Sequence, residues 1–139
     1  VAAFAALIDK IDTPVIMQSW SSSGLLGYLT AIERPERVKG ILAVETSVTA
    51  FDQIPASKLQ ILAKIPILIV IGDRAQDRVE ASRKFEAKMK AIGGDVTVDV
   101  LPENGIKGNG HTLMLEKNNR QIMFRMIAWM EGHIFNKGR

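Results

Sequence analysis

Four short apolar runs alternate with amphipathic stretches along the chain. The runs cover residues 15–18, 38–45, 67–71 and 96–101, and Pro14 and Pro66 precede the first and the third of them. Proline is tolerated at the first residue of a strand, where no ladder donor is needed. The first three runs are apolar on both faces, which is typical of parallel strands covered by helices. Residues 96–101 alternate with a period of two, so we expect an edge strand there.

The segments around these runs predict helices. We expect them over residues 1–8, 24–32, 58–63, 78–92 and about 118–133. In the last helix Met123, Ile127, Met130 and Ile134 recur at intervals of four and three, which predicts that they form its buried stripe. Repeated alternation of strand and helix predicts an α/β fold with a mostly parallel sheet, right-handed crossovers and helices on both faces.

Composition and charge narrow the class of protein. The chain has 139 residues, 47% of them hydrophobic and 24% charged, which is ordinary for one globular domain and excludes a disordered chain. No apolar run approaches the roughly 18 residues of a membrane span, and the absence of cysteine excludes disulfides and thiolate chemistry. The net charge of +3 is spread among interleaved acids and bases, so we expect no nucleic-acid partner.

A serine cluster follows the first predicted strand, where an α/β sheet carries its function. Ser21 lies between the small residues Ser19 and Ser23, and Gly24 opens the next helix. A serine on a tight strand-to-helix turn is the arrangement of a nucleophile elbow, whose strained backbone requires small neighbours. The alternative interpretation is a simple helix N-cap, for which serine is also favoured.

Other ionisable residues follow the later strands. Glu45 ends the second strand, Asp73 follows the third, and His111 follows the glycine-rich loop after the fourth. Taken singly, these residues also fit a solvated strand end or salt bridge, a helix cap and a surface histidine, and His133 is read only as a surface residue. Taken together, the order serine, acid, histidine is that of the α/β-hydrolases, in which a base activates the serine and a carboxylate orients the base.

Three stretches carry a closer resemblance: PVIMQSWSSSG with RPERVKGILAVE behind it, IPILIVIGD, and GIKGNGHTLMLEKNNRQI. With them, the whole chain resembles the C-terminal half of an α/β-hydrolase, from the helix before strand five to the last helix. It is most similar to esterases whose triad acid follows strand six. Ser19, Trp20 and Ser23 depart from residues common in that family, and Thr46 stands where a proline often follows the acid.

The resemblance implies a role for each matching position. Ser21 is the nucleophile, Glu45 the acid and His111 the base of a serine esterase that uses no cofactor or metal. The backbone N–H of Ser22 is one oxyanion donor, Trp20 is a candidate for the lining of a substrate pocket, and Asp73 is the alternative acid.

The resemblance also bears on what accompanies the chain. Residues 1–139 are expected to form one part of a single hydrolase domain. A second polypeptide, or the other product of a cleaved precursor, would then supply strands one to four and the second oxyanion donor. The compartment stays undetermined, although a secreted or periplasmic location would fit the resemblance.

Two other functional classes remain open at this stage. One is a catalytically silent hydrolase-like module that binds a small apolar ligand or a protein partner. The other is a flavodoxin-like phosphate binder, for which the serine-rich turn before a helix would serve as an anion site. No dinucleotide-binding signature accompanies the serine-rich turn in the sequence.

Overall fold

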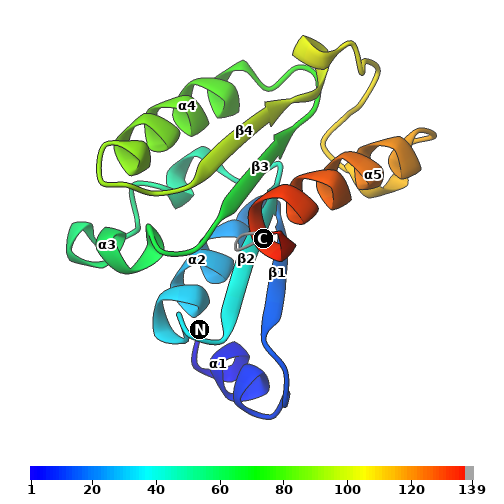
Figure 1. Cartoon of the computed structure of the whole chain (residues 1–139). Helices are drawn as coiled ribbons and strands as arrows, with labels where there is room; N and C mark the ends of the chain where they lie inside the picture. Colours follow the sequence, from blue (N-terminus) through cyan, green and yellow to red (C-terminus); the bar gives the residue numbers. More distant parts are fainter. Residues whose placement is uncertain (137–139) are drawn as a thin grey trace.

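A computed structural model describes residues 1–136, and within them the chain forms one four-stranded, fully parallel sheet (Figure 1). The strands lie in the order β1-β2-β3-β4, which is also their order along the chain. Their bounds are β1 Val15–Trp20, β2 Val38–Val44, β3 Ile67–Ile71 and β4 Val96–Val100. The predicted strands and their parallel arrangement are therefore confirmed, and β1 continues two residues beyond its predicted end.

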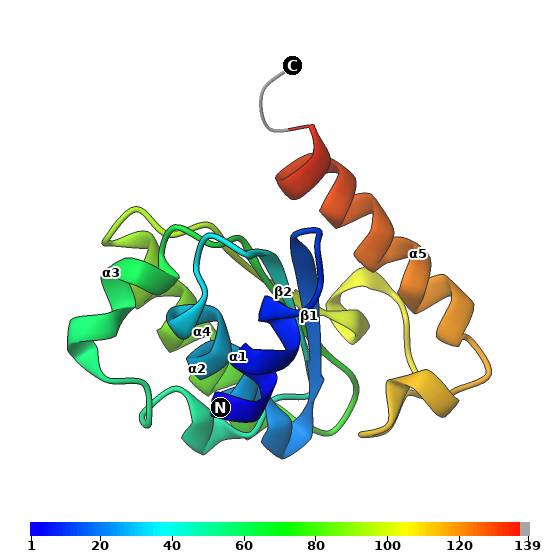
Figure 2. The ribbon, with the colours of Figure 1, turned by 90° about the horizontal axis from the view of Figure 1, so that it is seen from below.

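Helices cover both faces of the sheet (Figure 2). They are α1 Ala2–Asp9, α2 Gly24–Glu33, α3 Leu59–Leu62, α4 Gln76–Lys90 and α5 Asn119–Met130, with short 3₁₀ turns between them, among them η1 Ser21–Ser23 and η2 Val48–Ala50. None of the helices within residues 1–136 has the length and the apolar character that a membrane crossing requires.

The two faces of the sheet form separate apolar clusters. On one face the strands pack against α1, α2, α3 and α4, through residues such as Ile8, Tyr28 and Phe85. On the other face Leu42 and Leu68 belong to a smaller cluster that Ile122 and Met126 of α5 complete. Because β2 and β3 are covered on both faces, nearly all their residues are apolar, as the pattern of the sequence required.

The buried stripe of α5 agrees with the predicted one only in part. Met130 packs against the smaller cluster as predicted, but Ile122 and Met126 are the buried residues and Met123 is 41% exposed. Both sets of residues recur at helical intervals, so periodicity alone did not distinguish them. The orientation of α5 follows from polar anchors on β4: Arg125 donates two hydrogen bonds of 2.9 Å to the Asp99 carboxylate, and the Trp129 indole N–H donates to the Thr97 hydroxyl at 2.9 Å.

Candidate active site

The carboxyl ends of the parallel strands lie at one edge of the sheet, and the chain is strained there. Within residues 1–136, three residues other than glycine have a positive φ: Ser21 at 55°, Glu45 at 50° and Arg74 at 59°. Ser21 directly follows β1, Glu45 directly follows β2, and Arg74 comes shortly after β3. Side chains other than glycine rarely adopt this conformation, and such strain is concentrated at functional sites.

The turn that carries Ser21 is held by its neighbours. The Ser23 hydroxyl accepts a hydrogen bond of 2.9 Å from the backbone N–H of Trp20 and donates one of 2.6 Å to the Trp20 carbonyl. Behind the turn, Gly24 packs against Thr46: a Cβ atom on Gly24 would lie 2.4 Å from the Thr46 methyl carbon. The turn therefore has the steric demands of a nucleophile elbow, with serines in place of the usual glycines.

Replacement of Gly24 tests this packing. We expect Gly24→Ala to lower the free energy of unfolding by about 1–3 kcal/mol, because the added methyl group overlaps Thr46 in a packed core. Gly132→Ala is the matched control, since a Cβ there meets nothing within 4 Å. Urea unfolding of both variants measures the difference. Equal unfolding midpoints would contradict the steric argument.

The structure brings the side chains of Ser21, His111 and Glu45 together, with the imidazole between the hydroxyl and the carboxylate. The Ser21 hydroxyl lies 2.8 Å from Nε2 of His111, and Nδ1 of the same ring lies 3.2 Å from Oε2 of Glu45. The Glu45 side chain is 1% exposed, whereas that of His111 is 37% exposed. A buried carboxylate, an imidazole and a half-buried hydroxyl are therefore within hydrogen-bonding distance of one another in series.

The Glu45 carboxylate has two further partners. Oε1 accepts a hydrogen bond of 2.5 Å from the backbone N–H of Gly72, and Oε2 lies 3.3 Å from a guanidinium nitrogen of Arg78. Arg78 is not among the site residues that the sequence pattern predicts. One signal was present: Arg78 lies in the first turn of α4, where a cation opposes the helix dipole. Contact with a buried carboxylate accounts for a cation at that position.

Asp73 contacts a different group. Its carboxylate accepts a hydrogen bond of 2.8 Å from the backbone N–H of Asn109, and its own N–H donates to the Asn109 carbonyl at 2.9 Å. Glu116 binds the next residue of the loop, because its Oε1 accepts a hydrogen bond of 2.7 Å from the N–H of Gly110. These acidic residues thus hold the segment that presents His111, and Glu45 is the carboxylate that contacts the imidazole.

Ser22 and Trp20 flank Ser21 in different ways. Ser22 has an exposed side chain and is the second residue of η1, at the start of the helical segment, where backbone N–H groups lack partners within the helix. The Trp20 ring lies against His111, with ring centroids 5.1 Å apart. His133 is not an isolated surface residue: Nδ1 of its ring lies 3.0 Å from the Asp95 carboxylate.

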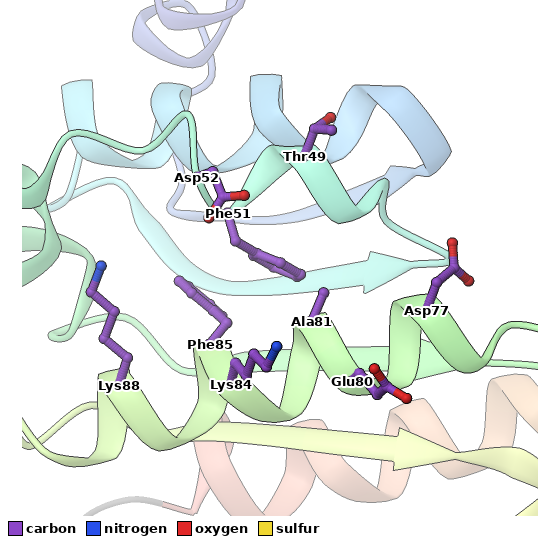
Figure 3. A pocket seen from close by; sticks show the side chains of 9 residues that line it. All are labelled: Thr49, Phe51, Asp52, Asp77, Glu80, Ala81, Lys84, Phe85 and Lys88. Atoms are coloured by element: carbon purple, nitrogen blue, oxygen red, sulfur yellow. The ribbon is translucent and has the colours of Figure 1, made fainter.

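Several hollows lie along the described part of the chain, and two of them are candidate places for a ligand. One of about 250 Å³ has a largely apolar lining on the α5 face, which includes Val44, Leu113 and Met114, close in sequence to Glu45 and His111. The other, of about 440 Å³, lies between the η2 segment and α4 (Figure 3). The lining of the second hollow combines the stacked Phe51 and Phe85 rings with side chains of both charges. Neither lining includes any of the three aligned side chains. Within residues 1–136, no three histidine or acidic side chains converge in the manner of a metal site.

Comparisons with known proteins bear on the class of protein. No protein-family profile matches the chain. It is 28% identical, over a 179-residue alignment, to a probable secreted lipase, phiG, of a fungal species (strain ATCC 74256), with 93% of this chain and 49% of that protein covered. Among solved structures it superimposes on a bacterial esterase known at atomic resolution with a TM-score of 0.82 and 28% identity, covering 95% of this chain and 42% of the esterase.

The fold and these relatives indicate the class of protein. The chain has the α/β fold of part of an esterase and is similar to an esterase and a lipase, which supports an α/β-hydrolase. It spans about half the length of the relatives that it matches, which fits one half of such a fold.

Proposed function

We propose that this chain carries the catalytic residues of a serine hydrolase that cleaves carboxylic esters, with Ser21 as nucleophile, His111 as base and Glu45 as acid. The observation that carries the proposal is the alignment of the three side chains, at 2.8 Å from serine to histidine and 3.2 Å from histidine to glutamate. The positive φ of Ser21 and the likeness to a lipase and an esterase support it.

The reaction proceeds by acyl transfer. With its proton on Nδ1, His111 donates a hydrogen bond to Glu45, and Nε2 is free to accept the Ser21 proton as the oxygen attacks the ester carbonyl. The tetrahedral intermediate collapses as the carbon–oxygen bond to the alcohol breaks, and Nε2 returns its proton to the departing alkoxide. Water, deprotonated by the same nitrogen, then attacks the acyl-enzyme carbonyl. As the carbon–oxygen bond to Ser21 breaks, Nε2 returns the proton to the serine oxygen and the carboxylic acid is released. The buried Glu45 stabilises the imidazolium in both halves of the cycle.

Stabilisation of the oxyanion is shared between this chain and another segment. The backbone N–H of Ser22 is one donor, and each such donor contributes about 2.7–4 kcal/mol to the transition state. In α/β-hydrolases the second donor comes from the loop after strand three. Since both relatives are about twice as long as the matched region, we propose that a segment outside these 139 residues supplies this donor and pairs with the open edge of β1.

The substrate class is inferred from the largely apolar hollow on the α5 face. It would take an aliphatic part of the ester, because most of its lining side chains, among them Val44, Leu113 and Met114, are apolar, and Arg120 is the charged residue in that lining. We therefore expect esters with an apolar acyl or alcohol group to be preferred over charged ones.

A fluorophosphonate probe tests the proposed function in the complete protein that contains this chain. We expect rapid covalent labelling, with the added mass on the peptide that contains Ser21, because the reagent reacts quickly only with an activated serine. Ser22→Ala is the matched control, since its exposed hydroxyl lies beside Ser21 and has no role in activation. It should be labelled at the rate of the unmodified protein.

The same labelling experiment decides between the proposal and its rival. Absence of labelling in a folded protein would contradict the proposed function and favour a silent module that binds an apolar ligand. Labelling that persists in Ser21→Ala would show that another residue is the nucleophile.

A further inference from the structure

Trp20 makes two separate contacts with the residue that we propose as the base. Its indole N–H donates a hydrogen bond of 2.8 Å to the backbone carbonyl of His111. Its ring is inclined at 42° to the imidazole, with the centroids 5.1 Å apart. The two residues are 91 positions apart in the sequence, so these contacts join the elbow directly to the loop after β4.

Trp20 is itself held in place. Its backbone N–H and carbonyl both bond to the Ser23 hydroxyl, and Gly24 behind that turn packs against Thr46. His111 lies on the loop after β4, and both Trp20 and His111 are more than a third exposed. Burial alone therefore does not fix the imidazole, and the two contacts with Trp20 restrict it further.

We propose that Trp20 is a positioning residue for His111: the indole N–H fixes the histidine backbone, and the indole ring restricts the imidazole to the position between Ser21 and Glu45. This inference rests on the proposed function and deepens it. The assignment replaces the expectation that Trp20 mainly lines a substrate pocket.

Steady-state kinetics on the complete protein distinguish a positioning role of Trp20 from a role in the substrate pocket. We expect Trp20→Leu to lower kcat by about 10–100-fold with little change in KM, because a small misplacement of a catalytic group costs up to about 10²-fold. Trp20→Phe keeps a ring but loses the N–H donor, so it should recover part of that loss. A raised KM with unchanged kcat in Trp20→Leu would overturn the proposal and return Trp20 to the substrate pocket.

The chain contains a matched control. Trp129 also stacks on a histidine, His133, with centroids 4.7 Å apart, and its indole N–H bonds to Thr97 on β4. Within residues 1–136, neither of these contacts of Trp129 involves Ser21, His111 or Glu45. Trp129→Phe should therefore leave kcat and KM unchanged, and a loss equal to that of Trp20→Leu would contradict a specific role for Trp20.

Fluorescence tests the contact independently of any esterase activity. The sequence has two tryptophans, so in a Trp129→Phe background the difference made by a further Trp20→Phe change isolates the Trp20 emission. Protonated imidazole quenches a neighbouring indole, and we expect the Trp20 emission to fall on acidification. The step should vanish when His111→Gln is added, with folding checked by circular dichroism.

Other charged groups surround this histidine and must be considered in the titration. Glu45 faces Nδ1 with Arg78 behind it, while Asp73 and Glu116 bind the backbone N–H groups of the two preceding residues. If the step persists without His111, one of these groups causes it and the proposal is wrong. If the protein proves inactive yet shows the His111-dependent step, the contact stands and the proposed function fails.

Discussion

Ser21→Ala is expected to abolish ester hydrolysis, with kcat lowered by a factor on the order of 10⁶, the loss found when the nucleophile of a serine hydrolase is removed. The physical reason is that the variant loses the atom that forms the acyl-enzyme, while the imidazole and the carboxylate stay in place. The fold should remain intact, because alanine is smaller than serine. Release of p-nitrophenol from its esters by the complete protein measures the rate, and circular dichroism checks the fold.

The neighbouring serines provide the controls for this variant. Ser22→Ala keeps its backbone N–H and loses only an exposed hydroxyl, so measurable activity should remain. Ser23→Ala removes both hydrogen bonds to the Trp20 backbone, and we expect an intermediate loss of activity. Hydrolysis by Ser21→Ala at the unmodified rate would show that the elbow is wrongly assigned.

Glu45→Gln is expected to lower kcat by about 10⁴-fold, the size of effect that the same type of change has in a serine protease. In this chain, glutamine has a single oxygen to serve Gly72, His111 and Arg78, which now share two. An amide N–H₂ group that faces Nδ1 favours the wrong tautomer of His111, and the ring then no longer accepts the Ser21 proton. The same p-nitrophenyl ester assay measures the loss.

Asp73→Asn is the matched control for the acid. Asparagine keeps an oxygen that can accept the hydrogen bond from the Asn109 N–H, so the histidine loop should stay in position and activity should fall about 10-fold or less. If Asp73→Asn proves the more damaging of the two variants, the choice of Glu45 as the acid is wrong.

The local sequence pattern was enough to predict most of the fold. An unbroken run such as Ile67–Ile71 has no polar side to expose, so it is stable only between two layers of helices, and both layers are present. Parallel strands in turn bring their carboxyl ends to one edge of the sheet, which is why Ser21, Glu45 and His111 could be nominated from the chain order. Most predicted bounds of the elements agree with the observed ones to within about two residues, and the exception is the end of α5, at residue 130 instead of about 133.

Hydrophobic periodicity did not identify the buried face of a helix where two sets of apolar residues had the same period. In α5 both Ile122 with Met126 and Met123 with Ile127 recur every four residues, and each pair would give an apolar stripe. The buried pair was selected by the pairing of Arg125 with Asp99 and by the packing of the helix on β2 and β3. Such contacts join residues far apart in sequence, and no local pattern encodes them.

The partners of the site residues were decided in the same way. Glu45 and Asp73 both follow strands, and their local sequences do not tell which carboxylate reaches the imidazole. The path of the loop after β4 does: Asp73 binds the backbone of Asn109, and the ring two residues later then faces Glu45. The contact of Arg78 with Glu45 and that of Trp20 with His111 likewise depend on the order of the strands and on side-chain direction. Sequence specifies the elements and the residues at their ends, whereas distances between residues up to 91 positions apart exist only once the sheet has assembled.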